Sequence, residues 1–358
     1  MESVIESPTT TFCASIRVDV DEQTQIGGAR RAAVALAQAQ RLASDTIGRL
    51  AIIATEAATN IVRHAGRGYV VMRGFTNQDG AGVELLALDK GPGIPDVTRA
   101  MRAGYSTIGT AGQGLGGIAR LADVFDIHSQ RGMGTAVLAR VGDRASRATR
   151  KATAMSAADD VGVVCVPLHG EIECGDAWQV NIDRNRIMVL VVDGLGHGPE
   201  AATAAAAAMT TFSKSAAASP EAMLVAFGAA LGDTRGAAAS IVAIHRARRQ
   251  IQFSGVGNVD GRVLSNGATQ HLIPQNGIVG HGMTTPRATD ATWPPGSRLV
   301  MHSDGIIPRW RLDAYETGAA SHPALLAGLI YRDFARDRDD ATVLVLRDAV
   351  GAVAEEQR

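Results

Sequence analysis

The sequence predicts two α/β domains in one chain. Its length of 358 residues favours two domains, at roughly 150 residues per domain. Hydrophobic residues make up 46% of the chain, which is enough to bury two cores. In the first half, helix patterns precede a mostly antiparallel set of strand patterns, which predicts a two-layer α/β sandwich. In the second half, frequent strands are interrupted by two helix patterns, which predicts two stacked sheets flanked by helices.

A polar, basic stretch separates the two halves. Residues 143–158 have the sequence DRASRATRKATAMSAA, which carries no strand or helix pattern. The segments on both sides of it carry strand patterns, so the stretch is interpreted as a linker. The first domain is therefore expected over residues 12–142 and the second over residues 159–350.

Hydrophobic periodicity gives the elements of the first domain. Apolar residues at helical spacing, such as Ile47, Leu50 and Ile53, predict a helix over residues 44–64. An aspartate that can cap a helix precedes residue 22 and predicts another helix, over residues 22–39. The further elements expected are strands at residues 12–20, 69–75, 82–89, 125–129 and 134–141 and a short helix at residues 115–122.

The second domain is richer in strand patterns. Short apolar runs bounded by turn residues predict strands at residues 161–168, 179–183, 186–193, 240–245, 250–255, 261–264, 298–303 and 342–347. Two helix patterns, at residues 199–215 and 220–232, interrupt this series.

Charge and composition exclude several function classes. The chain has 35 Lys and Arg against 36 Asp and Glu, so no global basic field favours nucleic acid or an anionic membrane. No run of 18 apolar residues predicts a membrane span, and the first residues lack the pattern of a signal peptide. Three cysteines without CxxC spacing exclude a disulfide scaffold. A cytoplasmic location is therefore expected.

Three polar strings in the first domain could form one site. Glu56 and Asn60 are four residues apart in a helix pattern, so both side chains project from one face, although a solvated helix face would give the same pattern. Asp89 ends an apolar strand and precedes Gly91 and Gly93, an arrangement that suits a flat purine or an ordinary turn.

A glycine-rich segment follows these strings and leads into a helix. It has the sequence GTAGQGLGG and contains Gly112, Gly114 and Gly116. Backbone N–H groups at a helix start favour phosphate, whereas a flexible loop is the simpler interpretation. The segment lacks the GK[ST] of a Walker loop.

In this order and spacing, TEAATNIVRHAG, LDKGPGI and GTAGQGLGG resemble the N-box, G1 box and G2 lid of the GHKL (Bergerat) ATPase fold. The similarity is greatest to RsbT-like serine kinases, the anti-sigma regulatory subfamily. The resemblance implies that Glu56 is the catalytic base and that Asn60 holds Mg²⁺ against the phosphates of ATP. It also implies that Asp89 receives the adenine amino group. The remaining residues that it assigns to the nucleotide are Gly91, Gly93, Gly112, Gly114 and Gly116.

Acidic residues recur at strand ends in the second domain. Asp176, Asp193, Asp304 and the pair Asp339–Asp340 each adjoin a strand pattern, and three of these signals adjoin glycine. Hard divalent cations prefer oxygen ligands, and two ions that share a water can activate it for phosphoryl transfer. A single Asp-Gly is usually a turn, but the recurrence favours a metal centre.

The strings DGLGHGPEAA, SDGI and DDATVLVL resemble PPM-type serine/threonine phosphatases of the SpoIIE branch, and RsbX-like phosphatases in particular. The resemblance implies an α-β-β-α sandwich that holds two Mn²⁺ or Mg²⁺ ions. The ligands it implies are Asp176, Asp193, Asp304 and Asp339, with the carbonyl of Gly194. Asp339 is preferred over Asp340 because the family's ligand opens a D-[DN]-x-[ST] string.

These resemblances together predict a bifunctional regulator of a stress-response partner switch. One domain would phosphorylate STAS-type proteins, such as RsbS- or RsbR-like antagonists of the stressosome, and the other would remove phosphate from serine or threonine. In the alternative, the first domain binds ATP without transferring phosphate. It would then hold a sigma factor, a STAS protein or a separate phosphatase, and gate the second domain.

Overall fold

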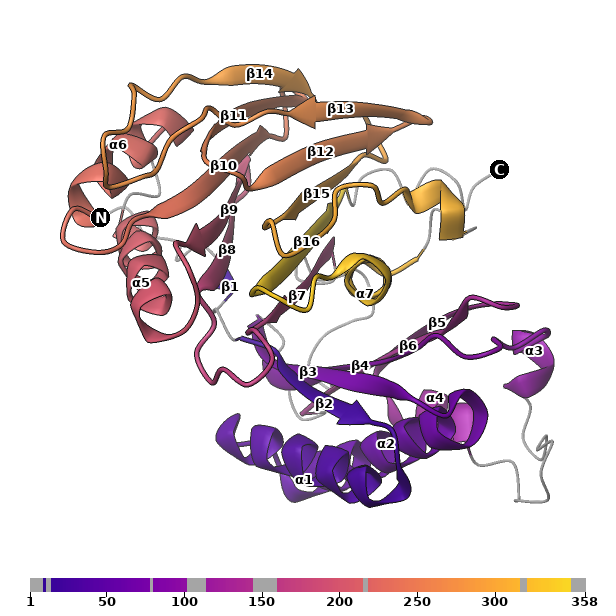
Figure 1. Cartoon of the computed structure of the whole chain (residues 1–358). Helices are drawn as coiled ribbons and strands as arrows, with labels where there is room; N and C mark the ends of the chain where they lie inside the picture. Colours follow the sequence, from indigo (N-terminus) through magenta and orange to yellow (C-terminus); the bar gives the residue numbers. More distant parts are fainter. Residues whose placement is uncertain are drawn as a thin grey trace, which may run out of the picture. The chain divides into compact units, whose positions relative to one another are not determined.

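The computed structural model describes residues 9–10, 14–77, 80–101, 114–143, 160–214, 218–315 and 321–348. Gly112 and almost all of the predicted linker lie outside these residues. The chain divides into two compact units, each described by itself (Figure 1). The N-terminal unit holds residues 15–143 and Arg311–Arg332. The C-terminal unit holds residues 160–310 and 333–348 together with strand β1 (Thr9–Thr10).

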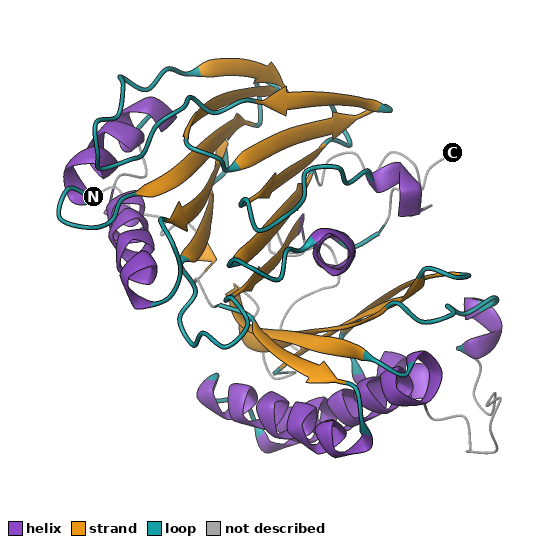
Figure 2. Ribbon diagram, viewed as in Figure 1, coloured by secondary structure: helices purple, strands orange, loops and turns teal. Residues whose placement is uncertain are grey.

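The N-terminal unit is built on a five-stranded antiparallel sheet, with helices α1, α2 and α4 packed on one face (Figure 2). The strand order is β2-β3-β4-β6-β5. Its strands are β2 (Ile16–Val20), β3 (Gly68–Asn77), β4 (Gly80–Asp89), β5 (Val124–Gln130) and β6 (Gly134–Gly142). Its helices are α1 (Gln23–Ala39), α2 (Ser44–Asn60), the π-helix η1 (Ile61–Ala65), α3 (Val97–Ala100) and α4 (Gly114–Leu121). The predicted two-layer class is confirmed.

The helical layer packs on the sheet through alternate strand residues. Met72 of β3 and Leu85 of β4 belong to one buried cluster with Leu50 and Ile53 of α2. Residues that alternate along a strand share one face, so the opposite face of the sheet carries the intervening residues. This packing fixes α2 on the sheet and so sets the position of the polar side chains at the end of α2.

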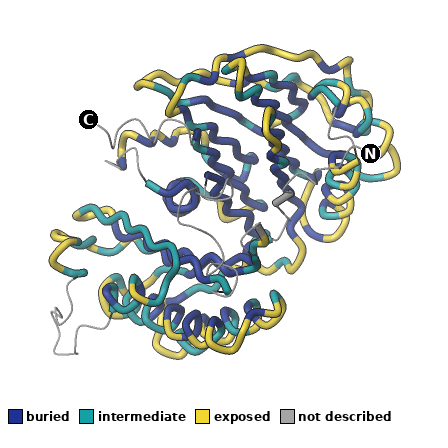
Figure 3. The backbone as a smooth tube through the Cα atoms, turned by 180° about the vertical axis from the view of Figure 1, so that it is seen from behind, coloured by how far each residue is buried: buried dark blue, intermediate teal, exposed yellow. Residues whose placement is uncertain are grey.

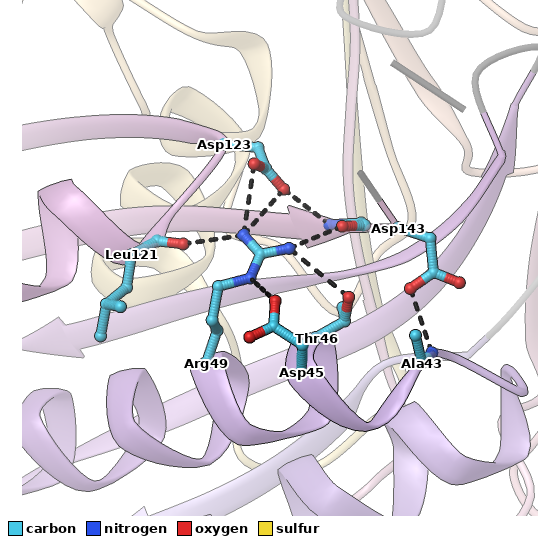
Figure 4. A network of polar contacts seen from close by, with 8 residues as sticks. Ala43, Asp45, Thr46, Arg49, Leu121, Asp123 and Asp143 are labelled. Atoms are coloured by element: carbon cyan, nitrogen blue, oxygen red, sulfur yellow. Dashed lines mark hydrogen bonds and ion pairs between the residues drawn. The ribbon is translucent and has the colours of Figure 1, made fainter. Parts of the chain in front are cut away.

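A buried arginine ties α2 to the sheet (Figure 4). Arg49 has an exposed side-chain fraction of 6% and forms an ion pair with Asp123, with an N–O distance of 3.3 Å. Its Nη2 also donates to the carbonyl of Gly142 at 2.8 Å, and its Nη1 to that of Leu121 at 3.0 Å. A guanidinium that is paired and hydrogen-bonded in this way satisfies most of the polar groups that burial would otherwise leave unmatched.

The other face of the sheet is also buried, and it carries a charged cluster. Glu84 of β4 lies between Arg73 of β3 and Arg140 of β6, with N–O distances of 2.8 and 2.5 Å. Burial opposes ionisation of this carboxyl, but Arg140 and Arg73 lower its pKa to about 2. Glu84 therefore stays ionised over the ordinary pH range.

Helix α7 (Pro323–Phe334) packs on this second face, which no sequence pattern predicted. A Cβ on Gly328 would come within 3.2 to 3.3 Å of side-chain carbons of Leu86 and Leu88, so glycine permits the close approach. The 3-10 helix η4 (Leu312–Tyr315) belongs to the same unit. The domains expected from the sequence, residues 12–142 and 159–350, therefore differ from the two compact units of the structure. The C-terminal unit also includes β1.

The C-terminal unit is a sandwich of two antiparallel sheets. Their strand orders are β1-β8-β9-β10-β11-β14 and β13-β12-β15-β16-β7. The bounds are β7 (Val161–Val166), β8 (Asp176–Ile182), β9 (Arg186–Gly194), β10 (Ala237–His245), β11 (Gln250–Val256), β12 (Asp260–Ser265), β13 (Ala268–Leu272), β14 (Thr289–Thr292), β15 (Arg298–His302) and β16 (Ala341–Arg347). β13 and β14 were missed because they are short and β13 is mostly exposed, so neither carries an apolar run.

Two cores stabilise this sandwich. Trp178, Phe253 and Met301 belong to a cluster contributed by both sheets. A second cluster lies between the first sheet and helices α5 (Pro199–Lys214) and α6 (Pro220–Ala230). In Figure 3 the central strands are dark blue, in agreement with their burial. None of the described helices is long and apolar enough to cross a membrane.

Candidate functional sites

The N-terminal unit contains a cavity of about 830 Å³ at the end of α2. Glu56, Asn60 and Asp89 all line it, as do Gly93 and Gly114. Residues of all three polar and glycine-rich strings therefore meet at one place. Of the other predicted nucleotide residues, Gly91 and Gly116 do not line this cavity, and Gly112 is not described. The cavity is large enough for a nucleotide-sized ligand.

A change of helix type shapes this end of α2. The helix continues beyond Asn60 as the π-helix η1, whereas the periodicity predicted one regular helix over residues 44–64. Single π-turns occur often at functional sites, since they redirect side chains. Arg63 and His64 of η1 line the cavity, and so does Arg99. These three cavity residues were not predicted. A regular helical pattern gives no sign of the π-turn, and Arg99 lies in the short helix α3, which no pattern predicted.

Asn60 carries a polar atom that suits a ligand. Its Nδ2 is buried and has no hydrogen-bond partner among the described residues. A Cβ on Gly114 would lie 3.2 Å from its Oδ1, so a glycine at the start of α4 leaves the Asn60 amide room. The amide offers both donor and acceptor capacity, and its oxygen is a suitable Mg²⁺ ligand.

Asp89 is held at the end of β4 by backbone donors. Its Oδ1 accepts hydrogen bonds from the N–H groups of Gly91 at 2.8 Å and Thr135 at 3.1 Å. Burial raises the pKa of this carboxyl, although the two backbone donors act in the opposite direction. Both of these bonds go to Oδ1, so Oδ2 keeps acceptor capacity for a ligand amino group.

The glycines after Asp89 are required by the backbone. Gly93 has a φ of +73°, and a Cβ there would lie 2.2 Å from the carbonyl oxygen of Gln130. A Cβ on Gly91 would lie 2.6 Å from that of Ala65. The LDKGPGI string therefore has a structural reason for both glycines, and this tight loop forms one wall of the cavity.

Replacement of Gly93 by alanine is expected to destabilise the N-terminal unit by about 1–3 kcal/mol and to weaken nucleotide binding. The matched control is Gly132→Ala, because Gly132 has a similar φ of +78° but no neighbouring atom within 4 Å of the position that a Cβ would take. That control should show the left-handed strain alone, about 1–2 kcal/mol. Urea unfolding measures both variants, and equal losses would contradict the predicted clash.

The acidic residues of the C-terminal unit also converge. Asp176 begins β8 and Asp193 lies near the end of β9, and the two face each other directly in the antiparallel register. Asp304 follows β15, and Asp339 precedes β16 in the other sheet. The charges of Asp176, Asp304 and Asp339 all act on Asp193, so these three predicted ligands lie within electrostatic range of it.

Electrostatic repulsion within this cluster is strong. Burial is the largest cause that raises the pKa of Asp193 to about 9, followed by the charges of Asp176, Asp304 and Asp339. Burial likewise raises the pKa of Asp176 to about 7, against a hydrogen bond from Ser303. A divalent cation would reverse this repulsion, so the donor set fits a metal centre.

The carboxylates are close but do not form a closed cage. Among the described residues, no three His, Cys, Asp or Glu side chains have the spacing that would hold an ion by themselves. A dinuclear centre takes part of its coordination from backbone carbonyls and water, so it does not need such a cage. The carbonyl of Gly194 stays a predicted ligand.

Asp339 and Asp340 have different surroundings. Asp340 is buried, and its carboxylate accepts hydrogen bonds from the N–H groups of Leu168 at 2.7 Å and Gly175 at 2.8 Å. Burial raises the pKa of the Asp339 carboxyl, and the charge of Asp304 raises it further. The preference for Asp339 as the ligand agrees with this arrangement, in which Asp340 holds the loop before β8.

Polar neighbours orient the acidic residues. The Ser303 hydroxyl donates to Asp176 at 2.6 Å, and the Asn258 amide donates to Asp304 at 2.6 Å. His197 Nδ1 lies 2.8 Å from Glu171 Oε1. The roles of Ser303 and Glu171 were not predicted, since neither residue belongs to an acidic strand-end signal.

Comparisons with known proteins match the two halves separately. The family model of the histidine kinase-like ATPase domain matches residues 20–141, and that of stage II sporulation protein E (SpoIIE) matches residues 183–348. The serine/threonine-protein kinase RsbT of Bacillus subtilis (strain 168) is 38% identical over 91 residues, which are 25% of this chain and 68% of RsbT.

The phosphoserine phosphatase RsbX of the same organism is 30% identical over 138 residues, which are 38% of this chain and 69% of RsbX. A solved chain from work on the bacterial stressosome, a modular system adapted to control secondary messenger signalling, has a TM-score of 0.50 and 30% identity. The match covers 52% of this chain and 98% of that chain.

Proposed function

The chain belongs to both families, since it joins a histidine kinase-like ATPase domain of the RsbT type to a SpoIIE phosphatase domain of the RsbX type, and on this basis we propose that it regulates a stress-response partner switch with two opposing activities. The first activity is ATP-dependent phosphorylation of serine or threonine on STAS-domain proteins. The second is metal-dependent removal of phosphate from phosphoserine or phosphothreonine. The observation that carries the kinase assignment is that Glu56, Asn60 and Asp89 line one cavity.

In the kinase reaction, each cavity residue has a role that its position supports. Asp89 accepts the adenine amino group, and Asn60 holds Mg²⁺ through its amide oxygen. Mg²⁺, when bound, neutralises charge on the phosphates of ATP. Glu56, one helical turn before Asn60, accepts the proton of the target hydroxyl, while Arg63 and Arg99 attract the phosphates.

In the phosphatase reaction, the four carboxylates and the Gly194 carbonyl would hold two Mn²⁺ or Mg²⁺ ions. The two metal ions would supply an activated water and polarise the phosphoryl oxygens. Ser303 and Asn258 keep two of the carboxylates oriented through their hydrogen bonds. The intact acidic set opposes the alternative of an inactive scaffold.

The alternative for the first domain is a binding module that holds a sigma factor, a STAS protein or a separate phosphatase without transferring phosphate. A chain that carries both activities would run a futile cycle if both acted on one phosphosite at the same time. We therefore assign the two activities to different phosphosites, or to one site under regulation.

Phosphate transfer to a STAS-domain protein tests the kinase assignment. The protein is incubated with candidate STAS-domain proteins and ATP in an Asp193→Asn background, which prevents removal of the product, and phosphate is located by mass spectrometry. Glu56→Gln is expected to lower incorporation at least about 100-fold without changing partner or nucleotide binding, because general base catalysis is typically worth that much.

Asp45→Asn is the matched control, because Asp45 lies on the same helix with 81% of its side chain exposed. It should label its partner as the parent protein does. If no STAS-domain protein is labelled by the parent protein although it binds both ATP and a partner, the binding-module alternative replaces the kinase assignment.

A further inference from the structure

Helix α7 lies within the part of the chain that matches the phosphatase family, but most of it packs in the N-terminal unit. It lies within residues 183–348, which match the SpoIIE family. Its residues up to Arg332 nevertheless form part of the N-terminal unit. A segment of the phosphatase sequence is thus built into the ATPase domain.

Specific contacts hold this segment on the sheet. The backbone N–H of His322 donates to Asp126 at 2.8 Å, just before α7 begins. The ring of Tyr331 packs edge-on against that of Tyr69, with 5.8 Å between centroids. Arg17 lies over the ring of Tyr69 and donates to the Tyr331 hydroxyl at 3.2 Å. These contacts involve β2, β3 and β5, so α7 is docked across most of the sheet.

Arg332, the last residue of α7 in the N-terminal unit, contacts a residue of the nucleotide cavity. Arg332 Nη1 donates to the backbone carbonyl of Asp89 at 3.1 Å. Asp89 is the residue whose carboxyl lines the cavity. A residue that lines the nucleotide cavity is therefore held by α7 through its backbone carbonyl.

The chain then continues directly to the metal centre. After Arg332 it enters the C-terminal unit, where the carbonyl of Phe334 accepts a hydrogen bond from Ile307 at 2.8 Å. Arg336 donates through its backbone N–H to the carbonyl of Gly305 at 2.7 Å. Gly305 follows Asp304, and Asp339 lies between α7 and β16. Asp339 therefore lies in the segment that leaves α7, and Asp304 is next to a residue that this segment holds.

We propose that α7 transmits nucleotide occupancy of the ATPase cavity to the metal centre of the phosphatase domain, through Arg332 and the segment at residues 333–340. The proposal rests on the proposed function, since it needs a nucleotide in one site and metal ions in the other. Nucleotide bound against Asp89 fixes the carbonyl that Arg332 holds. The end of α7 is then ordered, and Asp304 and Asp339 are better placed to bind metal. By linkage, metal binding raises nucleotide affinity by the same factor.

Hydrogen–deuterium exchange of the full-length protein tests the coupling directly. A non-hydrolysable ATP analogue with Mg²⁺ is compared with Mg²⁺ alone. Amides at residues 323–340 are expected to exchange about fivefold more slowly with nucleotide, within the usual range of coupling factors. In a second measurement, the free Mn²⁺ concentration for half-maximal cleavage of a phosphoserine peptide should fall by a similar factor.

Arg332→Ala should abolish both effects of nucleotide, and Arg332→Lys should retain part of them. Arg311→Ala is the matched control, because Arg311 lies in the same segment but is 76% exposed and pairs with Asp313. It should behave as the parent protein does. If Arg332→Ala unfolds, the exchange of residues 323–340 in the parent protein still decides the proposal.

The outcomes separate this proposal from the proposed function. Direct titration with a fluorescent nucleotide and phosphate release at saturating Mn²⁺ measure the two activities independently of coupling. Failure of either measurement contradicts the proposed function. If both succeed but nucleotide changes neither exchange at residues 323–340 nor the Mn²⁺ requirement, the coupling proposal alone is overturned.

Discussion

Replacement of Asp193 by asparagine is expected to abolish phosphatase activity and, in the same variant, to stabilise the metal-free protein. Activity should fall by roughly 10³-fold or more, because one carboxylate of the metal centre is lost. Stability should rise by about 1–2 kcal/mol, because Asp193 lies opposite Asp176 in a cluster of like charges. Phosphate release with Mn²⁺ and thermal unfolding in a chelator measure the two effects.

The stability of the metal-free protein should also depend on pH in a defined direction. The folded-state pKa of Asp193 is about 9, above the ordinary value of 3.8. A carboxyl with a raised folded-state pKa binds its proton more tightly when the protein is folded, so stability is lost as pH rises between these two values. Mn²⁺ should reverse this loss in the parent protein but much less in Asp193→Asn.

Asp290→Asn is a suitable control, since Asp290 is an exposed carboxylate on β14 of the same unit. It should leave both activity and stability near those of the parent protein. A decrease in the metal-free stability of Asp193→Asn would contradict the interpretation of the acidic cluster as mutually repulsive.

Replacement of Glu84 by alanine is expected to destabilise the N-terminal unit by about 3–5 kcal/mol. Its carboxylate is 1% exposed and pairs with both Arg73 and Arg140. Removal of the shared partner leaves two guanidinium groups buried without compensation, which costs far more than the loss of a surface ion pair. All three tryptophans, Trp178, Trp293 and Trp310, belong to the C-terminal unit. The midpoint of urea unfolding should therefore shift more when unfolding is followed by circular dichroism than when it is followed by tryptophan fluorescence.

The stability difference between the parent protein and Glu84→Ala should depend on pH, because the pKa of Glu84 is lowered in the folded state. Glu84 has a folded-state pKa of about 2, below its ordinary value of 4.5. Its contribution to stability is therefore fully present above about pH 4.5 and is lost as pH falls toward 2. The difference in free energy of unfolding between the parent protein and Glu84→Ala should decrease as pH falls over that interval. Asp313→Ala, which breaks the exposed pair with Arg311, should change little. A constant gap down to pH 2 would contradict the assigned role of Glu84.

The two-layer and sandwich folds could be predicted because local sequence patterns determine them. The periodicity of Leu50 and Ile53 gave α2, and the apolar runs before Asp89 and Asp193 gave β4 and β9. Glycine next to an acidic residue was informative for a physical reason. A Cβ on Gly305 would lie 1.9 Å from the carbonyl oxygen of Asp340, so the turn after Asp304 admits no side chain.

Long-range packing could not be predicted in the same way. The apolar residues of α7 indicate burial, but no local pattern shows that Gly328 meets Leu86, some 240 residues earlier in the chain. Arg63 and Arg99 were likewise missed, because the π-turn after Asn60 and the short helix α3, which contains Arg99, depend on the folded backbone. The roles of the predicted site residues stay predictions, although Glu56, Asn60 and Asp89 line one cavity.

The position of α7 in the chain has a consequence for biosynthesis. The N-terminal sheet is translated long before Pro323 leaves the ribosome, so Leu86 and Leu88 have no helix to cover them during that interval. At about 5–20 residues per second, the roughly 180 residues between β6 and α7 take on the order of 10–40 s to translate. The nascent ATPase domain thus passes through an aggregation-prone stage, and its final form becomes accessible only when synthesis of the whole polypeptide is almost finished.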